Sequence, residues 1–188
     1  MLYYVSTPPH SPWRHSMKKI ILASSLIVLG MSSAFAADGT ITINGLVTDN
    51  TCVVTTPAGG DLTVTLPTVS QTSLLTAGKT AGRTPFTLGL TGCKVGAVVG
   101  TYFEPGATVD FATGLLNNAG DAKNVKVQLL GSNNAVIPVL AGPTQTNSQF
   151  VTVADTSADL NYYAEYYATG AAETGTVNTS VQYTIIYN

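Results

Sequence analysis

Short segments in which polar and apolar residues alternate recur along most of this chain of 188 residues. A period of two places successive side chains on opposite faces of a β-strand, and the Thr, Val, Ile and Tyr residues in these segments favour strands. Turn residues separate the segments, and no stretch carries a convincing helical stripe, although residues 70–77 are compatible with a turn or two of helix. The pattern predicts a single-domain, all-β sandwich. The predicted strands are residues 40–43, 62–66, 86–90, 125–129, 150–153, 160–168 and 181–187.

The first 36 residues have the features of a secretory signal peptide. Lys18 and Lys19 precede an apolar run at residues 20–31, which is followed by the small-x-small sequence Ala34-Phe35-Ala36. The run is too short for a permanent membrane span, so we expect an exported protein that is not an integral membrane protein. Residues 1–16 carry no such pattern. We therefore expect translation to start at Met17 and cleavage to follow Ala36.

Cleavage at that point restricts the chemistry of the mature chain. Both histidines, His10 and His15, lie in the removed part, so the mature chain lacks the imidazole base of Ser-His-Asp and Cys-His enzymes. It also lacks the side chain that most often binds catalytic metals. Five of the eight Lys and Arg residues remain with all ten Asp and Glu residues, a net charge of −5 that disfavours nucleic acid as a partner. We expect no enzyme activity, no catalytic residue, no metal and no cofactor.

The chain contains two cysteines, Cys52 and Cys93. Two thiols in an exported domain most simply form one disulfide, and CxxC-type spacing that would indicate a redox or metal site is absent. A bond between them would close a loop of 41 residues. Closing a loop of that length stabilises a domain by roughly 4 kcal/mol in the loop-entropy model. The sequence therefore predicts a structural Cys52–Cys93 bond.

Both ends of the mature chain are strand-like and apolar on one face. At the N-terminal end the face consists of Ile41, Ile43, Gly45 and Val47, and the pattern alone favours a first strand of the chain's own sandwich. At the C-terminal end an apolar strand edge is expected to be adhesive unless something covers it. The residues of that C-terminal face are Val181, Tyr183, Ile185 and Tyr187.

Four tyrosines between residues 160 and 168 suggest a carbohydrate site, because aromatic rings stack on sugars. Alternation divides them, however: Tyr162 and Tyr166 fall on the predicted core face, and Tyr163 and Tyr167 fall on the other. We therefore consider ligand binding there the weaker interpretation.

Five stretches of the mature chain together carry a family resemblance. They are ADGTITINGLVTDNTC (37–52), AGRTPFTLGLTGC (81–93), YFEPG (102–106), LNYYAEYYATG (160–170) and VNTSVQYTIIYN (177–188). These stretches resemble the pilin subunits of chaperone–usher fimbriae, including type 1 fimbrial subunits and the major fimbrial subunits of respiratory pathogens. The resemblance covers nearly the whole mature chain.

The resemblance implies an incomplete immunoglobulin-like β-sandwich that lacks its last strand and is completed by a donor strand from a neighbouring subunit. A periplasmic chaperone would fill the gap first, and the N-terminal arm of another copy or a related pilin would replace it at the outer-membrane usher. The implied boundaries are a leader at 1–36, a donor arm at 37–50 and a pilin domain at 51–188. Ile41, Ile43 and Val47 would then enter a neighbour's groove, and Gly45 would face its tightest point. The groove and chaperone-pairing strand would carry Val181, Tyr183, Ile185 and Tyr187.

The resemblance implies a structural function at the cell surface, most simply as the major shaft pilin of an adhesive fimbria. A minor adaptor subunit near the fibre tip remains the alternative, since its arm would look much the same. A carbohydrate-binding tip adhesin fits less well, because such proteins resemble two-domain chains without a donor arm.

Overall fold

The computed structural model of the chain describes residues 41–47, 49, 52–140, 142, 145 and 147–188. The described residues fall into two units, one ending at Asn44 and one spanning Gly45–Asn188. All strands of the described residues lie in the second unit, together with the short 3₁₀ helix η1 (Gln71–Leu74). The strands are β1 (Val53–Thr56), β2 (Thr80–Thr91), β3 (Val98–Glu104), β4 (Val109–Asp110), β5 (Leu115–Asn117), β6 (Val125–Gly131), β7 (Val136–Ile137), β8 (Phe150–Thr152), β9 (Ser157–Ala168) and β10 (Gln182–Tyr187).

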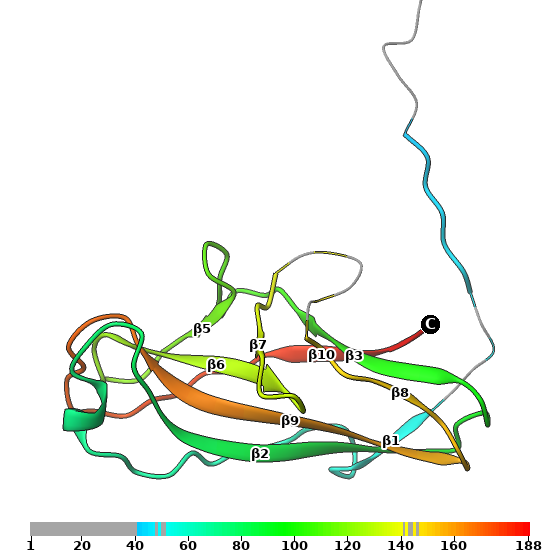
Figure 1. Cartoon of the computed structure of the whole chain (residues 1–188), viewed down its shortest axis with the longest axis horizontal. Helices are drawn as coiled ribbons and strands as arrows, with labels where there is room; N and C mark the ends of the chain where they lie inside the picture. Colours follow the sequence, from blue (N-terminus) through cyan, green and yellow to red (C-terminus); the bar gives the residue numbers. More distant parts are fainter. Residues whose placement is uncertain (1–40, 48, 50–51, 141, 143–144, 146) are drawn as a thin grey trace, which may run out of the picture. The chain divides into compact units, whose positions relative to one another are not determined.

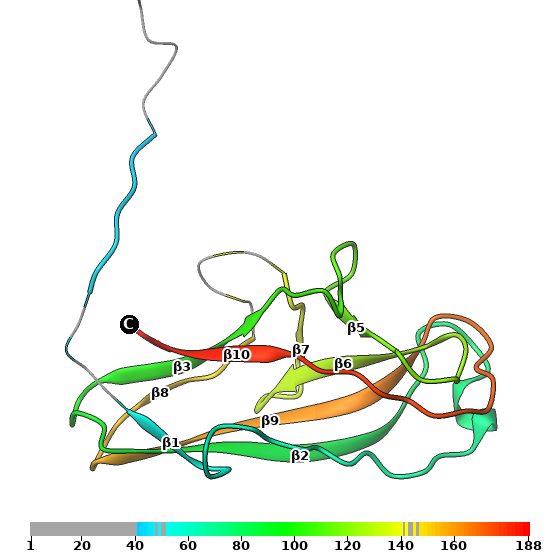
Figure 2. The same cartoon turned by 180° about the vertical axis from the view of Figure 1, so that it is seen from behind.

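The strands form two antiparallel sheets that make the two layers of a sandwich (Figures 1 and 2). The larger sheet has the order β1-β2-β9-β6-β5-β4, with β7 paired to β6, and the smaller sheet has the order β10-β3-β8. Apolar side chains from both sheets pack between the layers, where the rings of Phe103 and Tyr162 meet edge to face with centroids 5.2 Å apart. The predicted all-β sandwich is therefore confirmed.

The centre of the larger sheet follows the predicted alternation closely. Strand β9 pairs with β2 from Thr80↔Tyr167 to Thr91↔Ser157, and with β6 along its other edge. Its inward residues are buried, including Tyr162, which is fully inaccessible, and Tyr166 contributes to a second apolar cluster. The assignment of these two tyrosines to the core is confirmed.

The structure has no strand at residues 62–66 or at the described residues of 40–43, where strands were predicted, and it contains five strands that were not predicted, β1, β3, β4, β5 and β7. Residues 62–66 are extended but belong to no strand, because no strand lies beside them in the described part of the chain. Strand β3 was not predicted: it is the middle strand of the smaller sheet and is buried along most of its length, so its sequence lacks alternation. The prediction of a helical turn within 70–77 corresponds to η1, in which the amide of Thr72 donates a hydrogen bond to the Ser70 hydroxyl.

Several sequence-based expectations concern residues outside the described part. The signal peptide, its cleavage site and residue 40 of the first predicted strand are among them. Residues 41–43 belong to no strand. Within the described residues, no helix has the length and apolar character needed to cross a membrane.

Candidate functional site

An open groove with a volume of about 1080 Å³, lined by polar and apolar groups in similar measure, runs between two segments of the sandwich. The first margin is residues 59–66, between β1 and η1, and the second margin is residues 177–185, which include the first half of β10. Between the margins the groove reaches the side chains of the core, namely Phe86, Leu88, Phe103, Leu116, Val127 and Leu129.

Both margins have the sequence of strands but lack a strand partner on the groove side. Residues 61–66 and 177–181 belong to no strand in the described part of the chain, and β10 is an edge strand that pairs with β3 alone. Half-buried side chains nevertheless alternate with exposed ones along each margin. The half-buried ones include Val64 and Leu66 in the first margin and Val177 and Val181 in the second. Two facing edges with unpaired backbone groups indicate that one strand of the sandwich is missing between them.

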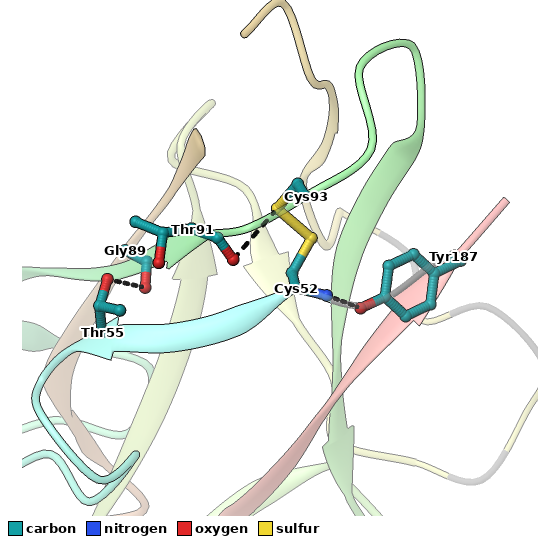
Figure 3. Close-up of a disulfide and its surroundings, with 6 residues drawn as sticks. All are labelled: Cys52, Thr55, Gly89, Thr91, Cys93 and Tyr187. Carbon is teal, nitrogen blue, oxygen red and sulfur yellow. Dashed lines mark hydrogen bonds between the residues drawn. A yellow bond between two sulfur atoms is a disulfide. The ribbon is translucent and has the colours of Figure 1, made fainter. Parts of the chain in front are cut away.

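The predicted groove residues divide into two groups. Val181, Tyr183 and Ile185 line the groove. Tyr187 does not line it, and its hydroxyl instead accepts a hydrogen bond of 2.7 Å from the backbone amide of Cys52 (Figure 3). Tyr187 therefore connects the end of β10 to the segment that leads into β1.

Tyr183 makes a second connection of this kind within the groove itself. Its hydroxyl donates a 2.6 Å hydrogen bond to the backbone carbonyl of Gly60 in the first margin. Gly60 has a φ of 89°, a conformation that side chains of other residues rarely allow. Burial, together with the charge of Asp61, raises the pKa of the Tyr183 hydroxyl.

Cys52 and Cys93 form the predicted disulfide (Figure 3). The bond joins the residue before β1 to a residue just beyond the end of β2, two strands that pair from Val53↔Thr91. It encloses the whole first margin of the groove in one covalent loop. The disulfide therefore fixes where the first margin begins relative to the larger sheet.

The predicted arm residues are exposed wherever the structure describes them. Ile41, Ile43 and Val47 are 89%, 88% and 98% exposed, and no atom lies within 4 Å of a Cβ placed on Gly45. Leu46, on the opposite face of the arm, is also 90% exposed, which the period-two pattern did not single out. Four large apolar side chains within seven residues are therefore almost fully exposed.

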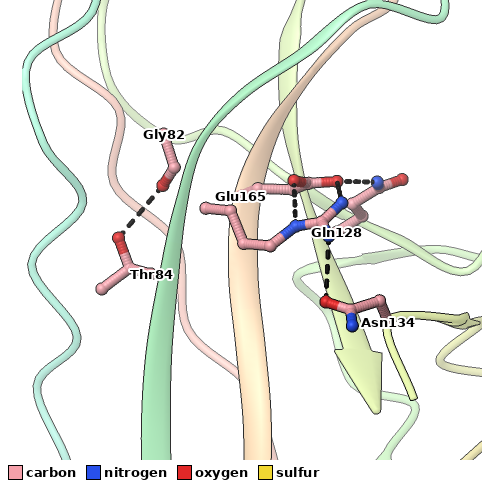
Figure 4. Close-up of polar contacts among 6 residues, drawn as sticks. Gly82, Thr84, Gln128, Asn134 and Glu165 are labelled. Atoms are coloured by element: carbon pink, nitrogen blue, oxygen red, sulfur yellow. Dashed lines mark hydrogen bonds and ion pairs between the residues drawn. The ribbon is translucent and has the colours of Figure 1, made fainter. Parts of the chain in front are cut away.

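A polar cluster on the larger sheet was not predicted. Glu165 on β9 is only 3% exposed although it lies on the outward face, and it accepts hydrogen bonds from Arg83 and Gln128 (Figure 4). Arg83 also donates to Asn134, and the bond to Glu165 raises the pKa of the guanidinium further. Every polar partner comes from a neighbouring strand or hairpin, so only strand register reveals the cluster.

A second ion pair joins Asp110 at the end of β4 to Lys126 on β6. The bond from Lys126, with further bonds from the Ala112 amide and the Thr113 hydroxyl, lowers the pKa of the Asp110 carboxyl to about 2. Both ion pairs lie away from the groove lining, and neither arrangement resembles a catalytic site.

Comparison with known proteins identifies the family. The sequence model of the type-1 fimbrial protein, A family matches residues 66–188. The major fimbrial subunit SMF-1 of Stenotrophomonas maltophilia is 63% identical over 163 residues, which cover 83% of this chain and 96% of that protein. The chain belongs to the type-1 fimbrial protein family.

Further similarities agree with this assignment. The F17 fimbrial protein of Escherichia coli is 44% identical over 180 residues, covering 91% of this chain and 99% of that protein. A chain from the structure of a chaperone–usher pilus has the same fold, with a TM-score of 0.58 at 18% identity over 81% of this chain and 96% of that one. The predicted membership of a fimbrial subunit family and the predicted incomplete sandwich are confirmed. The chain is a structural subunit of a bacterial surface fimbria.

Proposed function

We propose that this fimbrial subunit is the repeating unit of the fibre shaft and that it polymerises by donor-strand exchange. Residues 37–50 of one copy would occupy the groove of the next and complete its sandwich. The observation that carries the proposal is the groove between two unpaired margins, together with an arm whose apolar face is exposed. The sandwich of one copy lacks a strand, and the arm of another copy would supply it.

Burial of the arm would supply substantial free energy. Transfer of Ile41, Ile43 and Val47 out of water is worth roughly 1.5–3 kcal/mol each, or about 5–9 kcal/mol together. An inserted backbone would also pair with the free edge of β10 and with residues 61–66. The hydroxyl of Thr179, which lines the groove, is buried without a hydrogen-bond partner among the described residues and would gain one from the same backbone.

Before assembly the groove is expected to promote aggregation, because apolar core side chains and two unpaired backbone edges are accessible there. We infer that the subunit is exported as residues 37–188 after cleavage following Ala36, and that a periplasmic chaperone fills the groove with a strand of its own. At an outer-membrane usher the arm of the incoming subunit would replace that strand. Residues 51–188 would form the pilin domain, while residues 37–50 would serve the neighbour.

A fibre built in this way needs no covalent bond between subunits. Pairing within a β-sandwich joins residues distant in sequence, so both formation and loss of the inserted strand are expected to be slow. The fibre would persist through kinetic stability even where single contacts are weak. The proposed function is mechanical and structural.

The test is a denaturing gel of protein sheared from the cell surface, loaded with and without boiling and probed for this chain. We expect a ladder of multimers without boiling and one band near the mature mass after boiling. A variant lacking residues 37–47 is the matched control: it should give no ladder yet still form a complex with the chaperone. A single monomer band in both lanes would contradict polymerisation, and loss of the chaperone complex on truncation would mean that the arm belongs to its own domain.

The same preparation separates the shaft role from the adaptor role. A shaft subunit should dominate the protein mass of purified fibres, because it repeats along their length. Recovery of this chain as a trace component beside another dominant pilin would favour a minor adaptor near the tip.

A further inference from the structure

The arm contains a dipeptide with reactivity of its own, Asn44-Gly45. Asn44 is the only asparagine in the chain that is followed by glycine. Both residues are exposed and belong to no strand, and nothing in the described part of the chain lies within 4 Å of a Cβ placed on Gly45. Neither packing nor strand pairing among the described residues therefore holds the backbone in one conformation at this point.

An asparagine in this setting reacts with its own backbone. The amide nitrogen of Gly45 loses its proton and attacks the side-chain carbonyl carbon of Asn44. The new carbon–nitrogen bond closes a succinimide ring, the bond to the side-chain nitrogen breaks, and that nitrogen leaves as ammonia with the proton. Water then opens the ring at one of its two carbonyl groups, which gives either aspartate or isoaspartate. Glycine favours ring closure, because it has no side chain beside the nitrogen and leaves the backbone its widest conformational range.

Asparagines in the pilin domain are held by hydrogen bonds. Asn118, Asn124 and Asn147 each donate the side-chain nitrogen to a backbone carbonyl, at 2.9, 2.8 and 2.7 Å respectively. Asn147 is the best comparison, because it is exposed and is followed by the small residue Ser148. Its bond to the Val136 carbonyl fixes the side chain, whereas ring closure requires the side chain to turn onto the following amide. Asn44 combines the most permissive following residue with an unpacked backbone.

We propose that Asn44 is a site of spontaneous deamidation, which proceeds while the arm is free and is slowed when the arm is inserted into a neighbour. This inference rests on the proposed strand exchange and adds a chemical limit to the time for which a subunit can still polymerise. The backbone of a paired strand is extended, and ring closure requires Asn44 to leave that conformation. Reaction in a fibre therefore waits for local detachment of the arm, and its rate falls with the population of detached arms.

The two products have different effects on the arm. Aspartate leaves the backbone unchanged and adds a charge at a position that alternation places on the face opposite Ile41, Ile43 and Val47. Isoaspartate carries the main chain through the former side-chain carbon, so the backbone gains a carbon atom. The period of two is then broken between Ile43 and Val47, and the apolar residues before and after the break no longer share a face. Isoaspartate should therefore block insertion, and aspartate should not.

Peptide mapping of two pools of the chain tests the site. Unassembled subunits from the periplasm and fibres sheared from the same cells are incubated in parallel at neutral pH. Mass spectrometry of the arm peptide gives the fraction of Asn44 converted, and an isoaspartyl methyltransferase assay measures the isoaspartate. We expect conversion at Asn44 in the unassembled pool, conversion at least about tenfold slower in fibres, and none at Asn147 in either pool.

The other outcomes count against the inference in different ways. An intact Asn44 in the unassembled pool, or faster conversion at Asn147, would overturn the assignment of the site. Equal rates in the two pools while the unboiled ladder persists would overturn the protection and leave polymerisation intact. If the fibres gave no unboiled ladder, the proposed function itself would fail, together with the protection inferred from it.

A matched variant, Asn44→Gln, tests the consequence for assembly. Glutamine keeps the amide, but its longer side chain closes the corresponding ring far less readily. Unaltered and variant subunits, each bound to the chaperone, are aged and then mixed with chaperone-bound subunits that lack residues 37–47 and can only accept an arm. The readout is the dimer that survives an unboiled denaturing gel.

We expect ageing to reduce the dimer formed by the unaltered chain by the fraction of isoaspartate, and to leave the dimer formed by Asn44→Gln unchanged. Freshly prepared Asn44→Asp should form the dimer as the unaltered chain does, which separates the added charge from the altered backbone. Equal loss in Asn44→Gln, or no loss in the aged unaltered chain, would contradict the inference. Absence of the dimer even from the unaged, unaltered chain would contradict strand exchange instead.

Discussion

The two sides of this sandwich have similar sequences and different structures. At the centre of the larger sheet, β9 is paired along both edges and its inward residues are buried, apart from the half-buried Tyr166. Along the groove, residues 61–66 and 177–181 alternate in the same way, yet they form no strand and their apolar residues remain partly exposed. Alternation thus specifies which face a residue presents, whereas strand formation also requires a neighbour. The open side of the sandwich lacks the strand that would pair with both margins.

The largest effect is expected at the disulfide, which joins the residue before β1 to a residue just beyond β2. Replacing both cysteines by alanine, Cys52→Ala with Cys93→Ala, should lower the free energy of unfolding by about 4 kcal/mol, because the closed loop of 41 residues no longer restricts the unfolded chain. Urea unfolding of the purified mature chain, followed by circular dichroism, measures the change. A loss below about 1 kcal/mol would contradict the expected stabilisation by loop closure.

The same substitution on each side tests the comparison itself. Leu160→Ala removes a fully buried side chain of β9 and should cost about 3 kcal/mol of unfolding free energy. Leu66→Ala removes a half-buried side chain of the first margin and should cost about 1 kcal/mol in the unpolymerised chain. In assembled fibres the unfolding free-energy cost of Leu66→Ala should be larger, because an inserted strand would cover Leu66. Equal costs before assembly would show that the groove is already closed.

A smaller effect is expected from the bond that ties β10 to the segment before β1. Tyr187→Phe keeps the ring and removes the acceptor for the Cys52 amide, which should cost about 1 kcal/mol of unfolding free energy. Slower exchange of the Cys52 amide proton in the unaltered chain than in the variant would confirm the cause. Tyr163→Phe, a hydroxyl removal on the outward face of β9, serves as the control and should change little.

The smallest effect concerns the edge of the larger sheet at β4. Lys126→Met should move the pKa of Asp110 upward from about 2, though not fully to its ordinary value, because the Ala112 amide and the Thr113 hydroxyl still donate. The carboxyl has a lower pKa in the folded than in the unfolded state, so its contribution to stability is present above about pH 4. That contribution is lost as the pH falls from about 4 to 2. A carbon NMR titration of Asp110 measures the shift, and an unchanged pKa would exclude Lys126 as its main cause.

The sequence alone predicts the class of fold and the residues that face the core, because both depend on local alternation. Residues 86–90, 125–129 and 160–168 lie within β2, β6 and β9 as predicted. Strand β3 escapes prediction because it is the middle strand of its sheet and buried along most of its length, and residues 62–66 were assigned as a strand because alternation does not reveal a missing partner.

The polar contacts required the structure for a different reason. The direction of the Tyr183 and Tyr187 hydroxyls depends on how closely β10 approaches residues 52–60, which are more than 120 positions away. Glu165 carries no local signal of burial either. Its partners Arg83 and Gln128 are brought to it by strand pairing, with Gln128 directly opposite on β6 and Arg83 beside a bulge in β2.

The position of the disulfide determines how a fibre would carry tension. A pull on the arm reaches the domain at Cys52 and passes through the sulfur–sulfur bond to Cys93, at the end of the long strand β2. The residues between them, including the four-residue strand β1 and the first margin, form a loop that lies outside this covalent path. Force that enters through the arm would therefore reach the end of β2 without first peeling β1 from the sheet.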